Sequence, residues 1–331
     1  MTDAQDIGPS GLRPLGSSEL KVSPVALGTW PMAGVTTLDA NDADSIATLR
    51  ACAELRINFI DTSYVYGPNG ESEQLIRRAL GNNRDQFVLA TKCGIHYDRN
   101  GSQVNDARPE TIARECDESL RRLGTDRVEL YYLHSPDPQV SIAESAGAIQ
   151  RLVDTGKARF AGASNCRLEQ LQEFHAQCPL TAVQLPYNML QRGIEQKTLP
   201  WCREQGIGVV VYWALMKGLL AGKIRRESDL AENDSRRQYP MYQSEELEKN
   251  LALIEKLRQI ANDSGRTVAE VVINWTMHQP IITSVLCGAK RRWQLEESAA
   301  AMSWQLSESL LTQIEAALAA RGDAVVKRVF Q

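Results

Sequence analysis

Residues 128–163, VELYYLHSPDPQVSIAESAGAIQRLVDTGKARFAGA, contain the alternation that decides the fold of this chain. The apolar run Val128–Leu133 has the length of a strand that is buried on both faces. The next stretch has apolar residues at helical spacing and ends at Gly156, a residue type that favours helix caps. A second short run, Arg159–Ala163, follows. The segment therefore predicts a strand, a helix and a second strand.

Eight short runs of this kind recur along the chain, separated by longer stretches with helical spacing. They are Val22–Leu27, Phe59–Thr62, Phe87–Thr91, Val128–Leu133, Arg159–Ala163, Ala182–Leu185, Gly208–Tyr212 and Thr283–Cys287. Such an alternation favours an α/β fold of the (β/α)8 or TIM-barrel class, with parallel strands and residues 1–331 as one domain. An open dinucleotide-binding sheet is disfavoured, because the glycines of Gly8–Gly16 precede the first strand and lack the G-x-G-x-x-G spacing.

The last third of the chain departs from the simple alternation. A polar insertion, Arg225–Gln243, follows the seventh strand, and helices are expected at Glu245–Ala261 and Val268–Met277. A C-terminal extra helix, Ser307–Ala319, is predicted beyond the last strand–helix unit.

Composition excludes several classes of function. The formal net charge of -4 argues against nucleic acid or an anionic membrane as the main partner. Charged residues interrupt every apolar run, so no membrane span is expected. The seven cysteines are scattered and odd in number, which favours reduced thiols and a cytoplasmic location. The four histidines are equally dispersed, and no metal site is predicted.

Three titratable residues follow neighbouring predicted strands: Asp61, Lys92 and His134. The active site of such a barrel forms at the carboxyl ends of its strands. Taken singly, Asp61 could be a turn cap and His134 a hydrogen-bonded core residue. Charged residues seldom end buried strands without a partner, so the three together predict a catalytic site.

These groups suggest proton-transfer chemistry. A buried lysine and aspartate can compensate each other by pairing. A tyrosine held against the ammonium group would have its pKa lowered, and could protonate a carbonyl oxygen as a hydride arrives at carbon. Tyr64 and Tyr66 both lie in the loop after Asp61, and spacing alone leaves both open.

Several motifs of the chain resemble those of a known family. The run FIDTSYVYG at residues 59–67, followed by Ser72-Glu73, is very similar to the aldo-keto reductase motif. The similarity continues through LGTW (27–30), ATKCG (90–94), YLHSPD (132–137), GASN (162–165) and VQLPYN (183–188), and it spans Leu15 to Met302. The resemblance implies a nicotinamide-dependent oxidoreductase that reduces an aldehyde or ketone, similar to bacterial stress-related and sugar-aldehyde reductases.

The family motif places its catalytic tyrosine just before the glycine, which selects Tyr66. The implied tetrad is Asp61, Tyr66, Lys92 and His134. Tyr66 would donate the proton, Lys92 would lower its pKa, and Asp61 would be the counter-ion of Lys92. His134 would orient the substrate carbonyl.

The resemblance also implies how a cofactor is held. The expected contacts are Thr29, Trp30, Asp61, Ser164, Asn165, Gln184, Tyr212, Ala214, Leu215, Gly218, Gly288, Lys290, Gln294, Glu297 and Ser298. Ser164, Asn165 and Gln184 would bond the nicotinamide carboxamide, and Tyr212 would stack on its ring. Lys290 matches the family position for a 2′-phosphate, so NADP(H) is favoured over NAD(H). Trp213 and Lys217 are bulkier than the family pattern, and Ser298 replaces the usual asparagine.

The sequence leaves two other functions open. Lys92 could form a Schiff base, as in class I aldolases. The chain could also be a cofactor-binding regulatory subunit, because potassium-channel β subunits resemble the same family. The physiological substrate, the direction of reaction and the oligomeric state are not assigned by the sequence. The loops expected to set specificity lie around Trp30, at His96-Tyr97, in the insertion and at the C-terminal tail.

Overall fold

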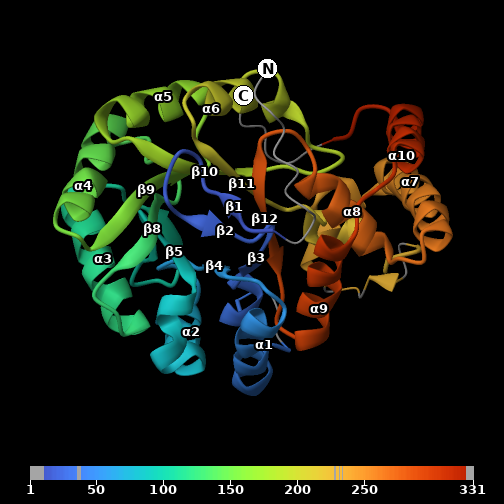
Figure 1. The fold of residues 1–331 in the computed structure, drawn as a ribbon. Coiled ribbons are helices and arrows are strands. Elements are labelled where there is room, and N and C mark those ends of the chain that lie inside the picture. The colour runs from blue at the N-terminus through green and yellow to red at the C-terminus, as the bar shows by residue number, and fades with distance from the viewer. Residues whose placement is uncertain (1–10, 36–38, 227–228, 231, 233, 326–331) are drawn as a thin grey trace.

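Val128–Leu133 forms strand β8, and all six of its residues are buried, as expected of a strand between a helix layer and a barrel interior. In the computed structural model, β8 is one of eight parallel strands in a closed barrel surrounded by helices (Figure 1). Around the barrel the strand order is β3, β4, β5, β8, β9, β10, β11 and β12, which pairs again with β3. The predicted (β/α)8 class is confirmed. The structure describes residues 11–35, 39–226, 229–230, 232 and 234–325.

Each predicted strand has a counterpart in the barrel. The barrel strands are β3 (Val25–Gly28), β4 (Phe59–Asp61), β5 (Val88–Cys93), β8 (Val128–Leu133), β9 (Ala158–Ser164), β10 (Leu180–Pro186), β11 (Gly208–Tyr212) and β12 (Ile282–Gly288). The α-helices are α1 (Asp42–Glu54), α2 (Glu71–Leu80), α3 (Pro109–Leu123), α4 (Ile142–Asp154), α5 (Leu168–Gln177), α6 (Thr198–Glu204), α7 (Ser244–Asp263), α8 (Val268–Met277), α9 (Arg292–Ala300) and α10 (Glu308–Arg321). The predicted extra C-terminal helix is thus present as α10.

The first predicted strand, Val22–Leu27, is split in the structure. Lys21–Val22 forms β2, which pairs antiparallel with β1 (Arg13–Pro14), and the barrel strand β3 begins only at Val25. Pro24 separates the two, and proline has no backbone N–H for a continuous ladder. Leu15, Leu20 and Val22 are buried in the cluster inside the barrel, so this hairpin closes its amino-terminal end.

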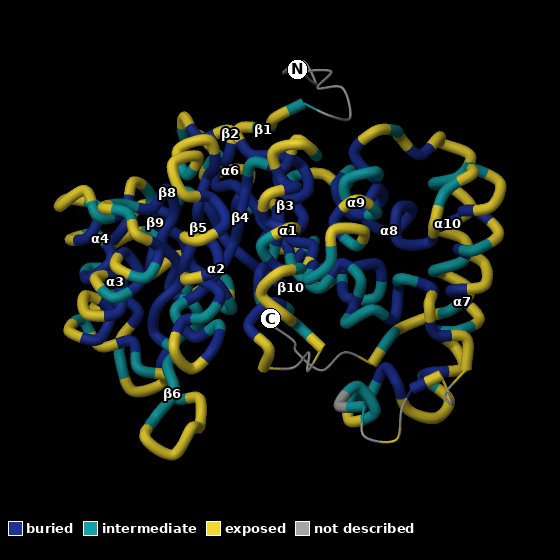
Figure 2. Tube along the Cα trace, turned by 90° about the horizontal axis from the view of Figure 1, so that it is seen from below, coloured by how far each residue is buried: buried dark blue, intermediate teal, exposed yellow. Residues whose placement is uncertain are grey.

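A second hairpin lies at the opposite end, where the sequence had indicated only a loop. It consists of β6 (Ile95–Tyr97) and β7 (Gln103–Asn105), which pair antiparallel directly after β5. Figure 2 shows this hairpin projecting from the barrel with an exposed tip. Its two strands are too short to show a period in the sequence.

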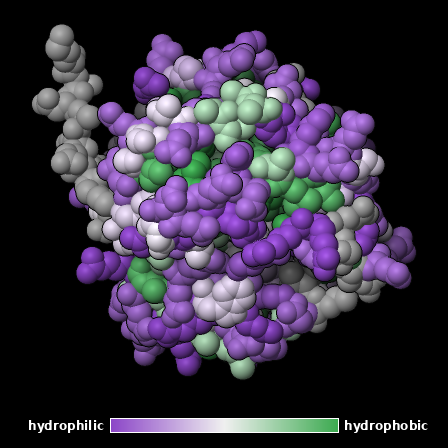
Figure 3. Space-filling view, turned by 90° about the vertical axis from the view of Figure 1, so that its right-hand side faces the viewer, coloured by the Kyte–Doolittle hydropathy of each residue, from purple (hydrophilic) through white to green (hydrophobic). Residues whose placement is uncertain are grey.

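The insertion after β11 contains two short 3-10 helices, Ser235–Gln238 and Pro240–Tyr242. Residues 227–228, 231 and 233 of the insertion and the tail 326–331 lie outside the described residues. Beside it, α10 packs on α7 (Figure 1), where Arg321 bonds Asn250 and Glu246. Figure 3 views this side of the molecule, and its surface is mostly hydrophilic with separate smaller apolar areas.

No described helix is long and apolar enough to cross a membrane. Within the described ranges, no three His, Cys, Asp or Glu side chains gather in a way that could hold a metal ion.

The barrel interior is filled where Gly162 makes room for Tyr132. A Cβ atom at Gly162 would lie 2.4 Å from the Tyr132 ring and 3.0 Å from the Ala182 carbonyl. We predict that Gly162→Ala lowers the free energy of unfolding by about 1–3 kcal/mol through overpacking. Chemical denaturation would measure this loss of stability.

The matched control is Gly147→Ala in α4, where no atom lies closer than 3.7 Å to the new Cβ. This control should be neutral or stabilising, since alanine favours helices. Equal effects of the two substitutions would contradict the packing argument.

Candidate active site

The strand-end residues form one layer that faces the barrel axis. The layer below fills the interior with Ala26, Phe59, Ala90, Tyr132, Gly162, Ala182, Val210 and Leu286. Two positions further along the chain from each come Gly28, Asp61, Lys92, His134, Ser164, Gln184, Tyr212 and Gly288. Residues two apart in a strand point to the same side, so these positions converge at the carboxyl end of the barrel.

The Lys92 side chain is 0% exposed, and its ammonium group has three oxygen neighbours. It donates to Asp61 Oδ1 at 2.5 Å and to the Thr62 carbonyl at 2.8 Å, and Tyr66 Oη lies at 3.4 Å. The other carboxylate oxygen of Asp61 accepts from Gln184 Nε2 at 2.8 Å. Burial raises the pKa of Asp61 and lowers that of Lys92, while each charge opposes the shift of the other. The pair therefore compensates its own charge in a buried place.

The loop after β4 turns Tyr66, and not Tyr64, toward Lys92. The Lys92 ammonium lies 4.9 Å from the centre of the Tyr66 ring. The Tyr64 hydroxyl instead donates to Glu118 Oε2 at 2.6 Å, and the Arg122 guanidinium lies 4.2 Å from the Tyr64 ring centre. Of the two tyrosines that spacing left open, Tyr66 is the one in contact with the lysine.

The expected effect of Lys92 on Tyr66 has the opposite direction in the structure. Burial raises the pKa of Tyr66 well above its ordinary value, and the negative charge of Asp61 raises it further. The ammonium is closer to Asp61 than to the Tyr66 oxygen, so its charge is mostly compensated there. The predicted lowering of the Tyr66 pKa is thus wrong for this state of the protein. Tyr66 is a neutral phenol at neutral pH.

His134 follows β8 and lies beside Tyr66. Its backbone N–H donates to the Cys93 carbonyl at 2.9 Å, and its own carbonyl accepts from Asn165 Nδ2 at 2.7 Å. The ring Nδ1 is 3.0 Å from Ser63 Oγ, and the ring centre is 6.0 Å from that of Tyr66. These contacts fix the orientation of the imidazole next to the tyrosine.

Buried polar side chains next to this cluster bond to its backbone and to one another. Thr29 is fully buried, and its hydroxyl donates to the Asp61 carbonyl at 3.0 Å while accepting from Ser72 Oγ at 2.6 Å. Thr29, an expected cofactor contact, thus has its hydroxyl bonded inside the fold. Glu73, whose role the sequence did not reveal, is 0% exposed and accepts from Thr91 Oγ1 at 2.8 Å. Ser72 thus bonds Thr29 just after β3, and Glu73 bonds Thr91 near the end of β5. Trp30 is half-buried, and its ring centre lies 5.1 Å from that of Tyr66.

The polar residues at the ends of β9 to β11 contact one another. Asn165 has a positive φ of 58°, and its Oδ1 accepts from the Tyr212 hydroxyl at 2.6 Å. Ser164 is buried next to it, and its Oγ accepts from Asn165 Nδ2 at 3.2 Å. Gln184 is 3% exposed. A cluster of amide and hydroxyl groups therefore lies beside the Lys92–Asp61 pair, through the Gln184 bond to Asp61.

The backbone after β11 is strained. Positive φ angles occur at Trp213 (65°), Met216 (45°), Lys217 (56°) and Gly218 (89°). Residues other than glycine adopt this region at a cost of about 1–3 kcal/mol each, and such strain concentrates at functional sites. Ala214 is buried and Leu215 half-buried between them. Trp213 and Lys217, the two residues bulkier than the family pattern, are both among these positive-φ positions.

The basic run before α9 is already paired with carboxylates. Lys290 bonds Asp39, and Arg291 bonds Asp44. The Arg292 guanidinium lies 2.7 Å from Glu54 and 2.8 Å from Glu296. The sequence indicated three cations at a helix start but could not reveal partners that come from the region of α1. Any phosphate bound here must compete with those carboxylates.

The remaining expected cofactor residues lie on or just before α9. Gln294 Oε1 accepts two backbone N–H groups at the start of the helix, at 3.0 and 3.1 Å. Glu297 pairs with Lys223 at 2.9 Å, which links α9 to the segment after β11. Ser298 is buried and its hydroxyl donates to the Gln294 carbonyl. Gly288 pairs with Gly28 in the barrel ladder.

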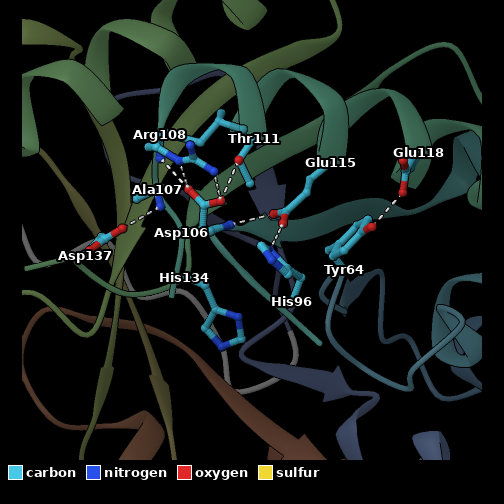
Figure 4. Close-up of polar contacts among 12 residues, drawn as sticks. Tyr64, His96, Asp106, Ala107, Arg108, Thr111, Glu115, Glu118, His134 and Asp137 are labelled. Carbon is cyan, nitrogen blue, oxygen red and sulfur yellow. Dashed lines mark hydrogen bonds and ion pairs between the residues drawn. The ribbon is translucent and has the colours of Figure 1, made fainter. Parts of the chain in front are cut away.

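The β6–β7 hairpin is fixed to α3 beside His134 (Figure 4). Asp106 N donates to the Gly94 carbonyl at 3.0 Å, and the Ala107 N–H donates to Asp137 Oδ2 at 3.1 Å. Glu115 of α3 accepts from the Gly94 N–H and contacts His96. The sequence reasoning missed Glu115, although a glutamate beside Cys116 on the apolar face of a helix was a signal that could have found it.

Comparisons with known proteins identify the family of the chain. The sequence model of the Aldo/keto reductase family matches residues 24–319. The chain belongs to this family. The aldo-keto reductase YhdN of Bacillus subtilis (strain 168) is 33% identical over 296 residues, which cover 88% of this chain and 89% of that relative. The protein is thus an oxidoreductase of small-molecule carbonyl compounds, in a family that generally uses NAD(P)H.

Two solved structures of aldo-keto reductases share the fold. The glycerol dehydrogenase AKR11B4 of Gluconobacter oxydans has a TM-score of 0.87 and 32% identity, with 98% of this chain and 99% of that chain covered. The aldo-keto reductase AKR11C1 of Bacillus halodurans, in a holo form, has a TM-score of 0.76 and 24% identity, with coverages of 93% and 96%. The latter comparison supports the fold alone.

The Lys92–Asp61 pair generates a prediction on stability. Lys92→Met or Asp61→Asn alone leaves one buried charge without its partner and should cost about 3–5 kcal/mol of unfolding free energy. The double variant, which removes both charges, should lose much less than the sum of the two. Chemical denaturation of the four proteins at pH 7 would measure the coupling. Additive losses would contradict the compensation described above.

Proposed function

We propose that this aldo-keto reductase uses NADPH to reduce an aldehyde or ketone to an alcohol, reversibly, with Tyr66 as the proton donor. The observation that carries the proposal is the neutral phenol of Tyr66, 3.4 Å from the Lys92 ammonium in a buried, charge-compensated cluster. The chemistry needs one hydride at the carbonyl carbon and one proton at its oxygen. The cofactor, when bound, supplies the hydride.

Tyr66 supplies the proton because its raised pKa keeps it protonated until the carbonyl oxygen gains negative charge. The phenolate left behind is stabilised by the Lys92 ammonium, an interaction that is stronger after proton transfer than before it. His134, held through Ser63 and the Cys93 carbonyl, has its ring centre 6.0 Å from that of Tyr66 and orients the carbonyl oxygen. Asp61 keeps Lys92 charged despite its burial.

The residues present suit a nicotinamide. Its carboxamide needs both donors and acceptors, which the buried Ser164 and Gln184 and the half-buried Asn165 offer. Tyr212, fixed by its bond to Asn165, offers a ring face next to that cluster. The strained segment around Gly218 and the helix start after Lys290 are the expected contacts of the phosphates and the adenosine half.

A Schiff-base function of Lys92 is less well supported. Its nitrogen is 0% exposed and is engaged by Asp61 and the Thr62 carbonyl, so a carbonyl carbon has no open approach. Borohydride trapping of Lys92 with a ketone would contradict this. A role as a cofactor-binding regulatory subunit would leave NADPH binding without turnover of test aldehydes.

Small hydroxylated compounds are the substrate class that we favour, because the similar protein from Gluconobacter oxydans is named a glycerol dehydrogenase. The seven buried cysteines have free thiols, which supports a cytoplasmic place of action. Screening aldehydes, ketones and sugars for NADPH oxidation would test the substrate class.

Tyr66→Phe tests the proton donor. Loss of the hydroxyl should reduce kcat for aldehyde reduction by about 10²–10⁴-fold, the usual contribution of a general acid. Binding of NADPH, measured by quenching of protein fluorescence, should stay unchanged, since the ring remains. Tyr64→Phe is the matched control and should keep its activity, because that hydroxyl bonds Glu118 outside the cluster. An unchanged rate of the Tyr66 variant would show that the mechanism is wrong.

The choice of cofactor depends on Lys290 and its partner Asp39. Lys290→Ala should weaken NADPH binding by about tenfold, the scale of one hydrogen bond to a charged group, and leave NADH binding nearly unchanged. Asp39→Asn should strengthen NADPH binding, because it removes the carboxylate that competes with the phosphate. Titration of each variant with both cofactors measures the two effects. Equal changes for NADPH and NADH would argue against a 2′-phosphate site at Lys290.

A further inference from the structure

One peptide group connects His134 to a buried carboxylate on α3. The Cys93 carbonyl accepts from the His134 backbone N–H at 2.9 Å. The N–H of the same peptide group belongs to Gly94 and donates to Glu115 Oε2 at 2.7 Å. Gly94 has a positive φ of 86°, so the chain turns sharply here, directly after β5. Glu115 therefore fixes the peptide plane that supports His134.

The second oxygen of Glu115 holds another histidine. Glu115 Oε1 lies 3.0 Å from His96 Nδ1, and the side chain of Glu115 is 0% exposed while that of His96 is 21% exposed. In Figure 4 the His96 ring lies below Glu115, and the His134 ring also projects below α3. Because Nδ1 faces the carboxylate, the other ring nitrogen, Nε2, is on the edge turned away from α3. His96 is two residues beyond Gly94, at the carboxyl end of the barrel where Tyr66 and Lys92 lie.

We propose that His96 Nε2 binds an oxygen on the carbon next to the substrate carbonyl, and that Glu115 positions His96 for this contact. The substrate class is then small carbonyl compounds with a neighbouring hydroxyl or ether oxygen. This inference rests on the proposed function. Glu115 acts through His96 and through the Cys93–Gly94 peptide, and is a positioning residue.

The proton content of the pair sets the role of Nε2. While the Glu115 carboxyl is protonated, it donates to Nδ1, and the neutral ring carries its hydrogen on Nε2, which donates. After that proton is lost, Nδ1–H donates to the carboxylate and Nε2 becomes an acceptor. Burial raises the pKa of Glu115 to about 8, although the Gly94 hydrogen bond lowers it. The change from donor to acceptor is therefore expected near pH 8.

The charges around the pair come from α3 and the segment before it. Arg114 lowers the pKa of Glu115, whereas Asp106 and Glu118 raise it. Asp106 is itself paired with Arg108, and the Glu118 carboxylate accepts from the Tyr64 hydroxyl. The buried Cys93 thiol has its pKa raised by burial and by Glu115, so it stays neutral. None of these named groups replaces His96 as a partner of Glu115 Oε1.

The first experiment compares glycolaldehyde with propanal, with NADPH as cofactor. His96→Leu should lower the kcat/KM ratio of glycolaldehyde to propanal by about three- to tenfold, the value of one hydrogen bond to a neutral group. The rate with propanal should change little, since it has no second oxygen. His96→Gln, which keeps a donor and an acceptor, should restore part of the ratio. A ratio that His96→Leu leaves unchanged would overturn the proposal.

The second experiment uses methoxyacetaldehyde, whose ether oxygen can only accept. In the wild-type protein its kcat/KM relative to propanal should fall as pH rises through about 8, because Nε2 loses its hydrogen. Glu115→Gln keeps an oxygen for the Gly94 N–H and donates its amide to Nδ1, so Nε2 carries a hydrogen at every pH. This variant should show a flat ratio. Glu118→Gln on the same helix is the control; it should keep the pH-dependent fall of the ratio, with the midpoint at a lower pH because the Glu118 charge raises the pKa of Glu115.

A readout without turnover separates this inference from the proposed function. Only four histidines are present, so the His96 ring resonances can be assigned in NMR spectra by substitution. They should shift near pH 8 as the Glu115 carboxyl of the wild-type protein ionises, and this transition should be absent in Glu115→Gln. A retained transition, or a pH-dependent ratio in Glu115→Gln, would overturn the positioning role of Glu115. Normal NMR behaviour with no carbonyl turned over would instead contradict the proposed function.

Discussion

The buried ion pair between Lys92 and Asp61 is the interaction on which the site depends. An ammonium and a carboxylate at 0% and 2% exposure lose most of their hydration, and only close, well-oriented partners offset that loss. The barrel provides them through its register. Asp61 lies beside Ala90 across the β4–β5 ladder, so Lys92, two residues further along, reaches back to it from the same interior face. The position of the pair thus depends on the closed strand arrangement. The environment of the Tyr66 hydroxyl depends in turn on the pair, because that hydroxyl lies next to the Lys92 ammonium.

Closure of the barrel also brings Gln184 within hydrogen-bonding distance of Asp61. Gln184 is on β10, which lies opposite β4 in the eight-stranded order, yet its amide bonds Asp61 at 2.8 Å. The hydrogen bond therefore spans the interior at the level of the site. An open sheet would place these strands too far apart for it. The amide cluster expected to hold a nicotinamide and the cluster expected to move the proton are joined by this bond, so displacement of Gln184 would alter the environment of Asp61 and, through it, of Lys92.

The sequence predicted what depends on local pattern and missed what depends on distant partners. Strand length, helix period and the residue just after each strand are local, and they yielded the barrel and the positions of Asp61, Lys92 and His134. The choice of Tyr66 required the family motif, because only the loop path separates it from Tyr64. The pKa direction of Tyr66 and the carboxylate partner of Lys290 are set by burial and by Asp39, far away in sequence. The position of Glu115 on the apolar face of α3 indicates burial, but its partners Gly94 and His96 lie on another element and cannot be derived from helical spacing.

Strand β5 connects the Lys92–Asp61 pair to the His96–Glu115 pair. Lys92 points into the barrel toward Asp61, while the peptide after Cys93 turns outward to Glu115, because neighbouring residues of a strand face opposite sides. The His134 backbone bonds that same peptide, so the proton-transfer cluster and the His96–Glu115 pair share one short, rigid segment. Any movement of α3 relative to the barrel would act on both. The substrate recognition proposed for His96 and the carbonyl orientation proposed for His134 would therefore be linked through the segment at the end of β5.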